Sequence, residues 1–193
     1  MKKVFIPIKN SIETLVYANI WVALAVVSLC GLTFLHLGKV DYALLWFVFF
    51  ATLLMYAYAR WFEEPTNALL TRSKISVWQK NNHRLYLLSG LSGLFGSMWF
   101  ALKLTPGTWA WLSICIAISA FYPLQIRAKG RVALRNVAGL KLFLISFVWA
   151  LVSTILPATQ VHEGLNTTVW LLFFQRFFFI VAITIPFDIR DLR

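Results

Sequence analysis

The chain has 193 residues, of which 60% are hydrophobic and 17% aromatic, while only 13% are charged. Soluble domains carry about 25% charged residues, and at this size they keep a large surface in water. These proportions exclude an ordinary water-soluble domain and indicate a surface that faces the lipid bilayer. The net charge of +11 lies in short clusters between apolar runs, which favours membrane-flanking segments and argues against nucleic acid as a partner.

Six apolar runs follow one another along the chain. Each is close to the roughly 17–25 residues that a helix needs to cross a bilayer. Because backbone groups in lipid must satisfy their own hydrogen bonds, helices are the expected form. The segment 177–183 shows no alternation typical of barrel strands. We therefore expect an all-α, polytopic transmembrane bundle forming a single domain, with helices at about 15–37, 42–61, 85–104, 108–125, 138–157 and 168–187.

The connections between these runs divide the cationic residues unequally. Fifteen of the eighteen Lys and Arg residues lie before the first run, in the second and fourth connections, or after the sixth run. The first, third and fifth connections hold only Lys39 and Lys103. Since cytoplasmic segments of membrane proteins are enriched in Lys and Arg, this alternation predicts about six spans with a cytoplasmic amino terminus. The expected location is the plasma (inner) membrane.

Two features inside the runs predict how the helices pack. The third run carries Ser89, Gly93 and Ser97 at four-residue spacing, and small residues so spaced allow two helices to approach closely in lipid. Arg176 lies within the sixth run, where a charge is costly. We expect its side chain to face protein or water, paired with a helix carbonyl or with a diphosphate, and we favour a structural role.

The stretch that follows the sixth run contains a pair of carboxylates. Asp188 and Asp191 are three residues apart, and they lie on one face if the helix continues this far. Two close carboxylates repel each other unless a cation joins them, and Mg²⁺ accepts one or two carboxylates together with phosphate oxygens. A solvated polar turn, balanced by Arg190 and Arg193, is the other interpretation of the same residues.

Residues 186–192, with the sequence Pro-Phe-Asp-Ile-Arg-Asp-Leu, resemble the second aspartate motif of the UbiA-type intramembrane prenyltransferases. In that superfamily the motif follows the sixth of about nine helices, on the cytoplasmic side. The segment 122–141, followed by Trp149, is similar to the family's region between helices four and five. The resemblance covers the whole chain as a helix pattern. It implies the amino-terminal part of such a protein, incomplete at its carboxyl terminus.

The resemblance implies transfer of an isoprenyl group from a prenyl diphosphate to a lipophilic acceptor, such as an aromatic ring or a tetrapyrrole. In this family Mg²⁺ held by two aspartate motifs binds the diphosphate. The metal ligands that it implies here are Asp188, Asp191 and, as a remnant of the first motif, Glu63; the implied diphosphate contacts are Arg190, Arg60 and Arg127. Arg127 belongs to a basic cluster whose other interpretation is a topology signal that meets lipid head groups.

The first aspartate motif of the family departs most from this chain. Its pattern, roughly N-x-x-x-D-R-x-x-D at the end of helix two, falls on Met55, Ala59, Arg60 and Glu63. Only Arg60 matches, Glu63 is a conservative replacement, and the side chains of Met55 and Ala59 do not bind magnesium. The alternative to an enzyme is therefore a non-catalytic integral membrane protein: a truncated relic, a partner subunit or a small transporter.

Overall fold

The computed structural model describes residues 13–61, 78, 81–121, 125–126, 132–133 and 139–191, with the backbone alone at 60–61, 121, 125–126, 132–133, 141 and 187–191. Every apolar run of the sequence contains a helix. The helical elements are α2 (Ile20–Leu37), α3 (Tyr42–Trp61), α5 (His83–Ala101), α6 (Pro106–Phe121), α7 (Leu140–Ala150), the π-helix η2 (Leu151–Ile155), α8 (Leu156–Gln160) and α9 (Thr167–Asp191). The fold class of a helical bundle is thus as expected.

The first helix does not run unbroken from residue 15, as the sequence had suggested. Residues 13–17 are helical, but Asn19 has a φ of 62° and separates this turn from α2. Asparagine adopts the left-handed conformation more readily than most residues. The carbonyl of Asn19 then accepts the N–H of Ala23 at 3.1 Å and begins the new helix. The continuous first span therefore begins at Ile20.

The turn between α5 and α6 also differs from the expected boundaries of 104 and 108. Thr105 precedes α6, and its hydroxyl oxygen accepts the N–H of Thr108 at 3.3 Å, as an N-cap residue does. Pro106 occupies the first helical position, where a missing N–H costs nothing. These two signals start α6 two residues early, and α5 ends at Ala101.

The expected extension of the fourth helix to residue 125 is wrong. Residues Gln125–Ile126 form strand β1, which pairs antiparallel with β2, Val132–Ala133. The partners across the ladder are Ile126 and Val132, and Gln125 and Ala133. β-Branched residues favour this extended form. This two-stranded ladder in the fourth connection is the one sheet within the described ranges.

The fifth helical segment continues past its expected end at residue 157. It passes from α7 through η2 into α8 and ends at Gln160, with Pro157 inside it. The π-helix accommodates this, because the N–H of Leu156 donates to the carbonyl of Leu151, five residues back. The sixth helix likewise extends beyond 187 to Asp191, with Pro186 in its interior.

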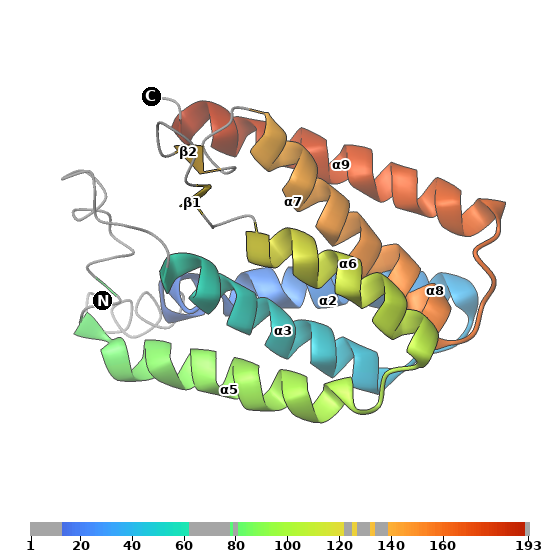
Figure 1. Ribbon diagram of the computed structural model, residues 1–193, viewed down its shortest axis with the longest axis horizontal. Helices are drawn as coiled ribbons and strands as arrows, with labels where there is room; N and C mark the ends of the chain where they lie inside the picture. The colour runs from blue at the N-terminus through green and yellow to red at the C-terminus, as the bar shows by residue number, and fades with distance from the viewer. Residues whose placement is uncertain are drawn as a thin grey trace, which may run out of the picture.

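Successive helical segments run in opposite directions (Figure 1). The short connections 38–41, 102–105 and 161–166 lie together at one end of the bundle. The far ends of α3, α6 and α9 and the beginnings of α5 and α7 lie at the opposite end. Helix α5 packs on α3 at one edge, α9 packs on α7 at the other, and α2 and α6 lie between them.

The α3–α5 contact confirms the packing role of small residues in the third run. A Cβ atom added to Gly93 would lie 2.8 Å from the backbone nitrogen of Leu54 and 3.0 Å from the carbonyl oxygen of Phe50. Gly93 and Ser97 are both buried. The two backbones therefore approach closely at Gly93, as small residues permit in membrane helices.

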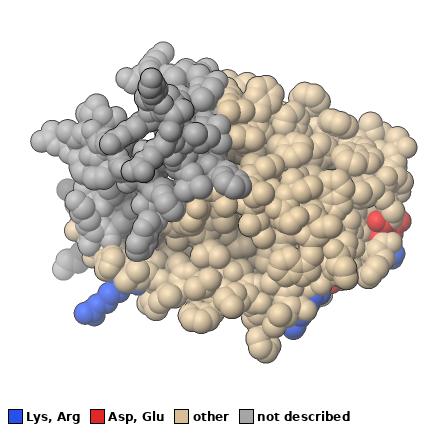
Figure 2. Space-filling view, in the orientation of Figure 1, with Lys and Arg blue, Asp and Glu red and all other residues tan. Residues whose placement is uncertain are grey.

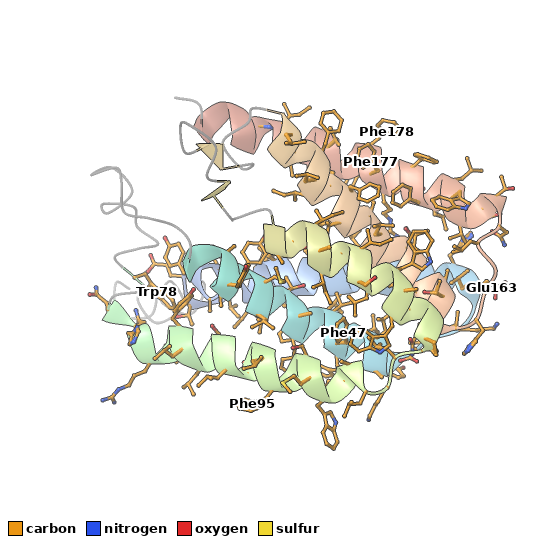
Figure 3. All side chains as sticks on the ribbon, viewed as in Figure 1. Phe47, Trp78, Phe95, Glu163, Phe177 and Phe178 are labelled. Carbon is orange, nitrogen blue, oxygen red and sulfur yellow. The ribbon has the colours of Figure 1, made fainter. Side chains whose placement is uncertain are left out.

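Two apolar clusters form the interior of the bundle. One joins α2, α3, α6 and α8 around Phe34, Leu44 and Leu156. The other joins α6, α7, η2 and α9, and includes Cys115, Ile155 and Phe173. In Figure 3, Phe177 lies on the α7 side of α9, where its ring centroid is 6.2 Å from that of Phe143.

The outer surface is apolar. Phe95 on α5 is 67% exposed and Phe178 on α9 is 65% exposed, and many other large hydrophobic side chains are exposed in the same way. Figure 2 shows a broad uncharged surface with charged side chains at its margins. Among the described residues, four helical segments are long and apolar enough to cross a membrane: Ile20–Leu37, Tyr42–Ala59, Leu142–Gln160 and Thr167–Pro186. These properties suit a protein surrounded by lipid.

Candidate functional site

The carboxylate pair singled out in the sequence lies on the last turns of α9. The helix includes both Asp188 and Asp191, so the condition for placing them on one helix face is met by the backbone. Their side chains and that of Arg190 lie outside the described part. The end of α9 is at the same end of the bundle as the end of α3 (Figure 1).

The residues expected from the first aspartate motif lie around the end of α3. Arg60 is in the last turn of this helix, and only its backbone is described. Glu63 and the fourth-connection residue Arg127 fall outside the described residues. Met55 and Ala59, which occupy the motif's Asn and Asp positions, lie on α3 and are both partly buried. The structure therefore places the helices on which the two motifs were predicted but not the distances between the candidate ligands.

Two tyrosines join the helix ends next to these positions. The hydroxyl of Tyr58 on α3 donates to the carbonyl of Ala120 on α6 at 3.3 Å. The hydroxyl of Tyr86 on α5 donates to the carbonyl of Ala57 on α3, also at 3.3 Å. The last turn of α3 is thus held between α5 and α6. This arrangement gives the first-motif positions a fixed helical support.

Arg176 lies midway along α9 and reaches across to α2. One terminal nitrogen of its guanidinium donates to the carbonyl of Leu29 at 2.7 Å, and the other lies 3.4 Å from the hydroxyl oxygen of Thr33. The expectation of a helix carbonyl as partner is confirmed. The guanidinium joins two helices that are distant in sequence.

The hydroxyl of Thr33 meets a carbonyl that the helix itself leaves free. Pro157 has no N–H, so the carbonyl of Ser153, four residues earlier, lacks its usual helical donor. Thr33 supplies the missing hydrogen bond at 2.6 Å. The π-helix similarly diverts the N–H of Leu156 away from Val152, whose carbonyl accepts the thiol of Cys30 at 3.4 Å. Both α2 side chains therefore complement the irregular segment η2.

Sequence reasoning missed a polar cluster at the opposite end of the bundle. The side chain of Gln160, 5% exposed, makes four hydrogen bonds. Its amide nitrogen donates to Asp41 at 2.9 Å and to the carbonyl of Lys103 at 3.3 Å. Its oxygen accepts the N–H of Thr105 at 3.1 Å and the hydroxyl of Thr108 at 3.0 Å. These bonds use the whole capacity of an amide and tie together all three short connections.

The signal for this cluster was present in the sequence but ambiguous. Asp41, Thr105 and Gln160 each stand beside an apolar run, where polar residues are ordinary turn formers. An ion pair between Lys39 and Glu163, with 3.2 Å between nitrogen and oxygen, lies at the same end of the bundle. Figure 3 labels Glu163 there. Nothing in the one-dimensional pattern pairs these residues, because they are brought together by the return of each helix.

Within the part of the chain that has described side chains, no three His, Cys, Asp or Glu residues gather in a way that would hold a metal ion. The carboxylates expected to do so have side chains outside that part. Comparisons of the chain with protein-family models, with curated proteins and with solved structures found no significant match.

Proposed function

We propose that this chain is a UbiA-type membrane prenyltransferase, which transfers an isoprenyl group from a prenyl diphosphate to a lipophilic acceptor. The observation that carries the proposal is the extension of α9 through Asp191, because a continuous helix gives the aspartates the spacing that a shared cation needs. The residues assigned to Mg²⁺ are Asp188, Asp191 and Glu63; those assigned to the diphosphate are Arg190, Arg60 and Arg127.

The chemistry of these groups suits that role. Mg²⁺ prefers oxygen ligands and commonly joins carboxylates to substrate phosphates. A bound metal supplies stabilisation of the negative charge that develops on a leaving diphosphate. The arginines add cationic groups that bind phosphate oxygens, and the apolar bundle offers surroundings in which a greasy donor and acceptor are soluble.

The proposed topology has six spans and a cytoplasmic amino terminus in the plasma membrane. The unequal division of cations between the two ends supports this orientation, since fifteen Lys and Arg residues belong to one side. The antiparallel course of the helical segments agrees with the same division. The aspartate pair then faces the cytoplasm, where prenyl diphosphates are soluble.

A second candidate is a non-catalytic membrane protein that has kept one of the two motifs. The observation favouring it is the pair Met55 and Ala59 on α3, whose side chains offer no carboxylate or amide oxygen to a metal. Such a protein would hold a prenyl diphosphate through the α9 residues alone and would not turn it over.

The test uses the purified full chain in detergent micelles with farnesyl diphosphate as the probe. We expect Mg²⁺-dependent binding that falls at least about tenfold in Asp188→Asn and in Asp191→Asn, since a tenfold change corresponds to about 1.4 kcal/mol. Asn166→Asp, at the start of α9 on the opposite side of the membrane, is the matched control. Equal binding by wild type and both α9 variants sinks the proposal. Binding together with diphosphate release in the presence of an aromatic acceptor supports the enzyme; binding alone supports the second candidate.

A further inference from the structure

Arg176 occupies the middle layer of the bundle. It is the tenth residue of α9 and therefore lies about 14 Å from the start of that helix, at 1.5 Å per residue. Its partner Leu29 is the tenth residue of α2. The contact between them is thus near the centre of two apolar segments that are each long enough to cross a membrane.

Among the side chains that the structure describes, no acidic one lies at this depth. All seven acidic residues precede a helical segment, follow one, or lie in its first or last turns: Glu13, Asp41, Glu63, Glu64, Glu163, Asp188 and Asp191. On α9 itself, the acidic residue nearest to Arg176 is Asp188. It lies twelve residues further along the helix, or about 18 Å by helical rise. Within the described part of the chain, no acidic residue of the same layer therefore balances the positive charge of Arg176.

The hydrogen bonds of Arg176 satisfy only part of its guanidinium. This group has five N–H donors and remains charged in proteins. Its two bonds in the bundle go to a neutral carbonyl and a neutral hydroxyl. An unpaired charge in a dry layer costs several kcal/mol, and arginines in spans pair with anions or line a polar path. Both acceptors are neutral, and none of the side chains described in the structure supplies a counter-ion.

The surroundings of Arg176 suit a ligand with an apolar tail. Arg176 is only partly buried, so part of the residue is open to the surroundings of the bundle. One turn away on α9, Phe179 is 52% exposed, and one turn from Leu29 on α2, Leu32 is 56% exposed. A cation thus lies on an otherwise apolar face with large hydrophobic side chains beside it on both helices.

We propose that Arg176 binds the oxyanion head of an amphiphile, a carboxylate or a phosphate, at the junction of α2 and α9, with the apolar tail along the exposed side chains of these helices. Guanidinium forms paired hydrogen bonds with either anion. The remaining N–H groups of Arg176 supply the donors, and the carbonyl of Leu29 and the hydroxyl of Thr33 hold the fork in place. This site is separate from the α9 aspartates and requires no metal.

The experiment measures quenching of tryptophan fluorescence by 9,10-dibromostearate in the full chain, held in neutral phosphatidylcholine nanodiscs. The uncharged control ligand is 9,10-dibromostearyl alcohol, which has the same tail. We expect the acid to bind at least about tenfold tighter than the alcohol. Arg176→Gln should remove this preference and Arg176→Lys should keep part of it, whereas the neighbouring variant Gln175→Leu should keep all of it.

A third ligand, brominated phosphatidic acid, tells the two heads apart: the site takes whichever anion shows an affinity that depends on Arg176. Equal affinity for the alcohol and for both anions in the wild type overturns the proposal. So does an unchanged preference in a folded Arg176→Gln protein. If that variant fails to fold, the comparison of ligands on the wild type and on Arg176→Lys still decides.

Discussion

Thr33 shows how much one hydroxyl does inside the bundle. It donates to the Ser153 carbonyl that Pro157 leaves without a helical donor, and it accepts from Arg176. A buried carbonyl without a partner is costly, and in lipid there is no water to replace the bond. The side chain therefore links a break in one helix to a cation on another.

We expect Thr33→Val to lower the free energy of unfolding by about 1–2 kcal/mol, because the Ser153 carbonyl then lacks a donor. Thr33→Ser, which keeps the hydroxyl, should lose much less. The measurement is an unfolding titration with sodium dodecyl sulfate in mixed micelles. In a Pro157→Ala background, residue 157 regains an N–H for Ser153, so the cost of Thr33→Val should shrink. An equal cost in both backgrounds contradicts the assignment.

The contacts of individual residues were only partly predictable from the sequence. The position of Arg176 in an apolar run was enough to predict that its side chain faces protein or water, and a helix carbonyl was among the expected partners. The hydrogen bonds of Thr33 and Cys30 were not predictable, because the carbonyls that accept them are free only where η2 departs from α-helical hydrogen bonding. That departure depends on the fit of α7 and α8 against α2, which no local pattern contains.

Among the elements, the α3–α5 pair contains the close approach between two helices that the small residues of the third run had predicted. The four-residue spacing of small side chains identified the face of α5, and Gly93 lies directly over the backbone of α3. Gly90 lies on the same face but has more room, since an added Cβ would lie 3.4 Å from the Cβ of Ala57. The two glycines form a matched pair for mutation.

Gly93→Ala should lower the free energy of unfolding by about 1–3 kcal/mol, because a methyl group there forces the two backbones apart. Gly90→Ala should change it by less than about 0.5 kcal/mol, since its methyl group makes an ordinary contact. Both are measured by the same detergent titration. Similar changes in the two variants would show that the close approach at Gly93 does not set the effect.

The ends of the elements were less predictable than their existence. Apolar runs located the long helical segments of the described part of the chain, because length and composition decide whether a segment suits lipid. They did not locate the break at Asn19, the start at Pro106 or the continuation through Pro157. These depend on left-handed backbone, on capping and on tertiary hydrogen bonds, respectively, and the same polar residues are common in ordinary turns.

For the whole molecule, the antiparallel course of the helices and the division of cations make a joint prediction about orientation. Cysteine introduced at Gly164, in the short connection before α9, should react with a membrane-impermeant maleimide in intact cells. Cysteine at Asp188 should react only after the membrane is permeabilised. The native thiols, Cys30 and Cys115, are buried and provide the unlabelled background. Labelling of position 188 from outside would reverse the orientation and remove the aspartates from the cytoplasm.

For the molecule as a whole, the sequence was sufficient to predict the class of protein and to predict which end of the bundle carries the aspartates. It was not sufficient to predict which helices are neighbours, since every apolar helix face can in principle contact lipid or protein. The candidate metal site stays a prediction for Asp188, Asp191 and Glu63. By contrast, the polar cluster around Gln160 was invisible until the three short connections were placed together.

The four bonds of Gln160 have a consequence for biosynthesis. The amide lies 119 residues after Asp41 and 55 residues after Thr105. While only the first four helical segments have been synthesised, the Gln160 amide does not yet exist. The carboxylate of Asp41 and the N–H of Thr105 are then hydrated instead. The loops already made on that side of the membrane are therefore joined to one another only when the fifth segment arrives. Translation order therefore delays the rigidity of this corner until the fifth of the six helical segments has been made.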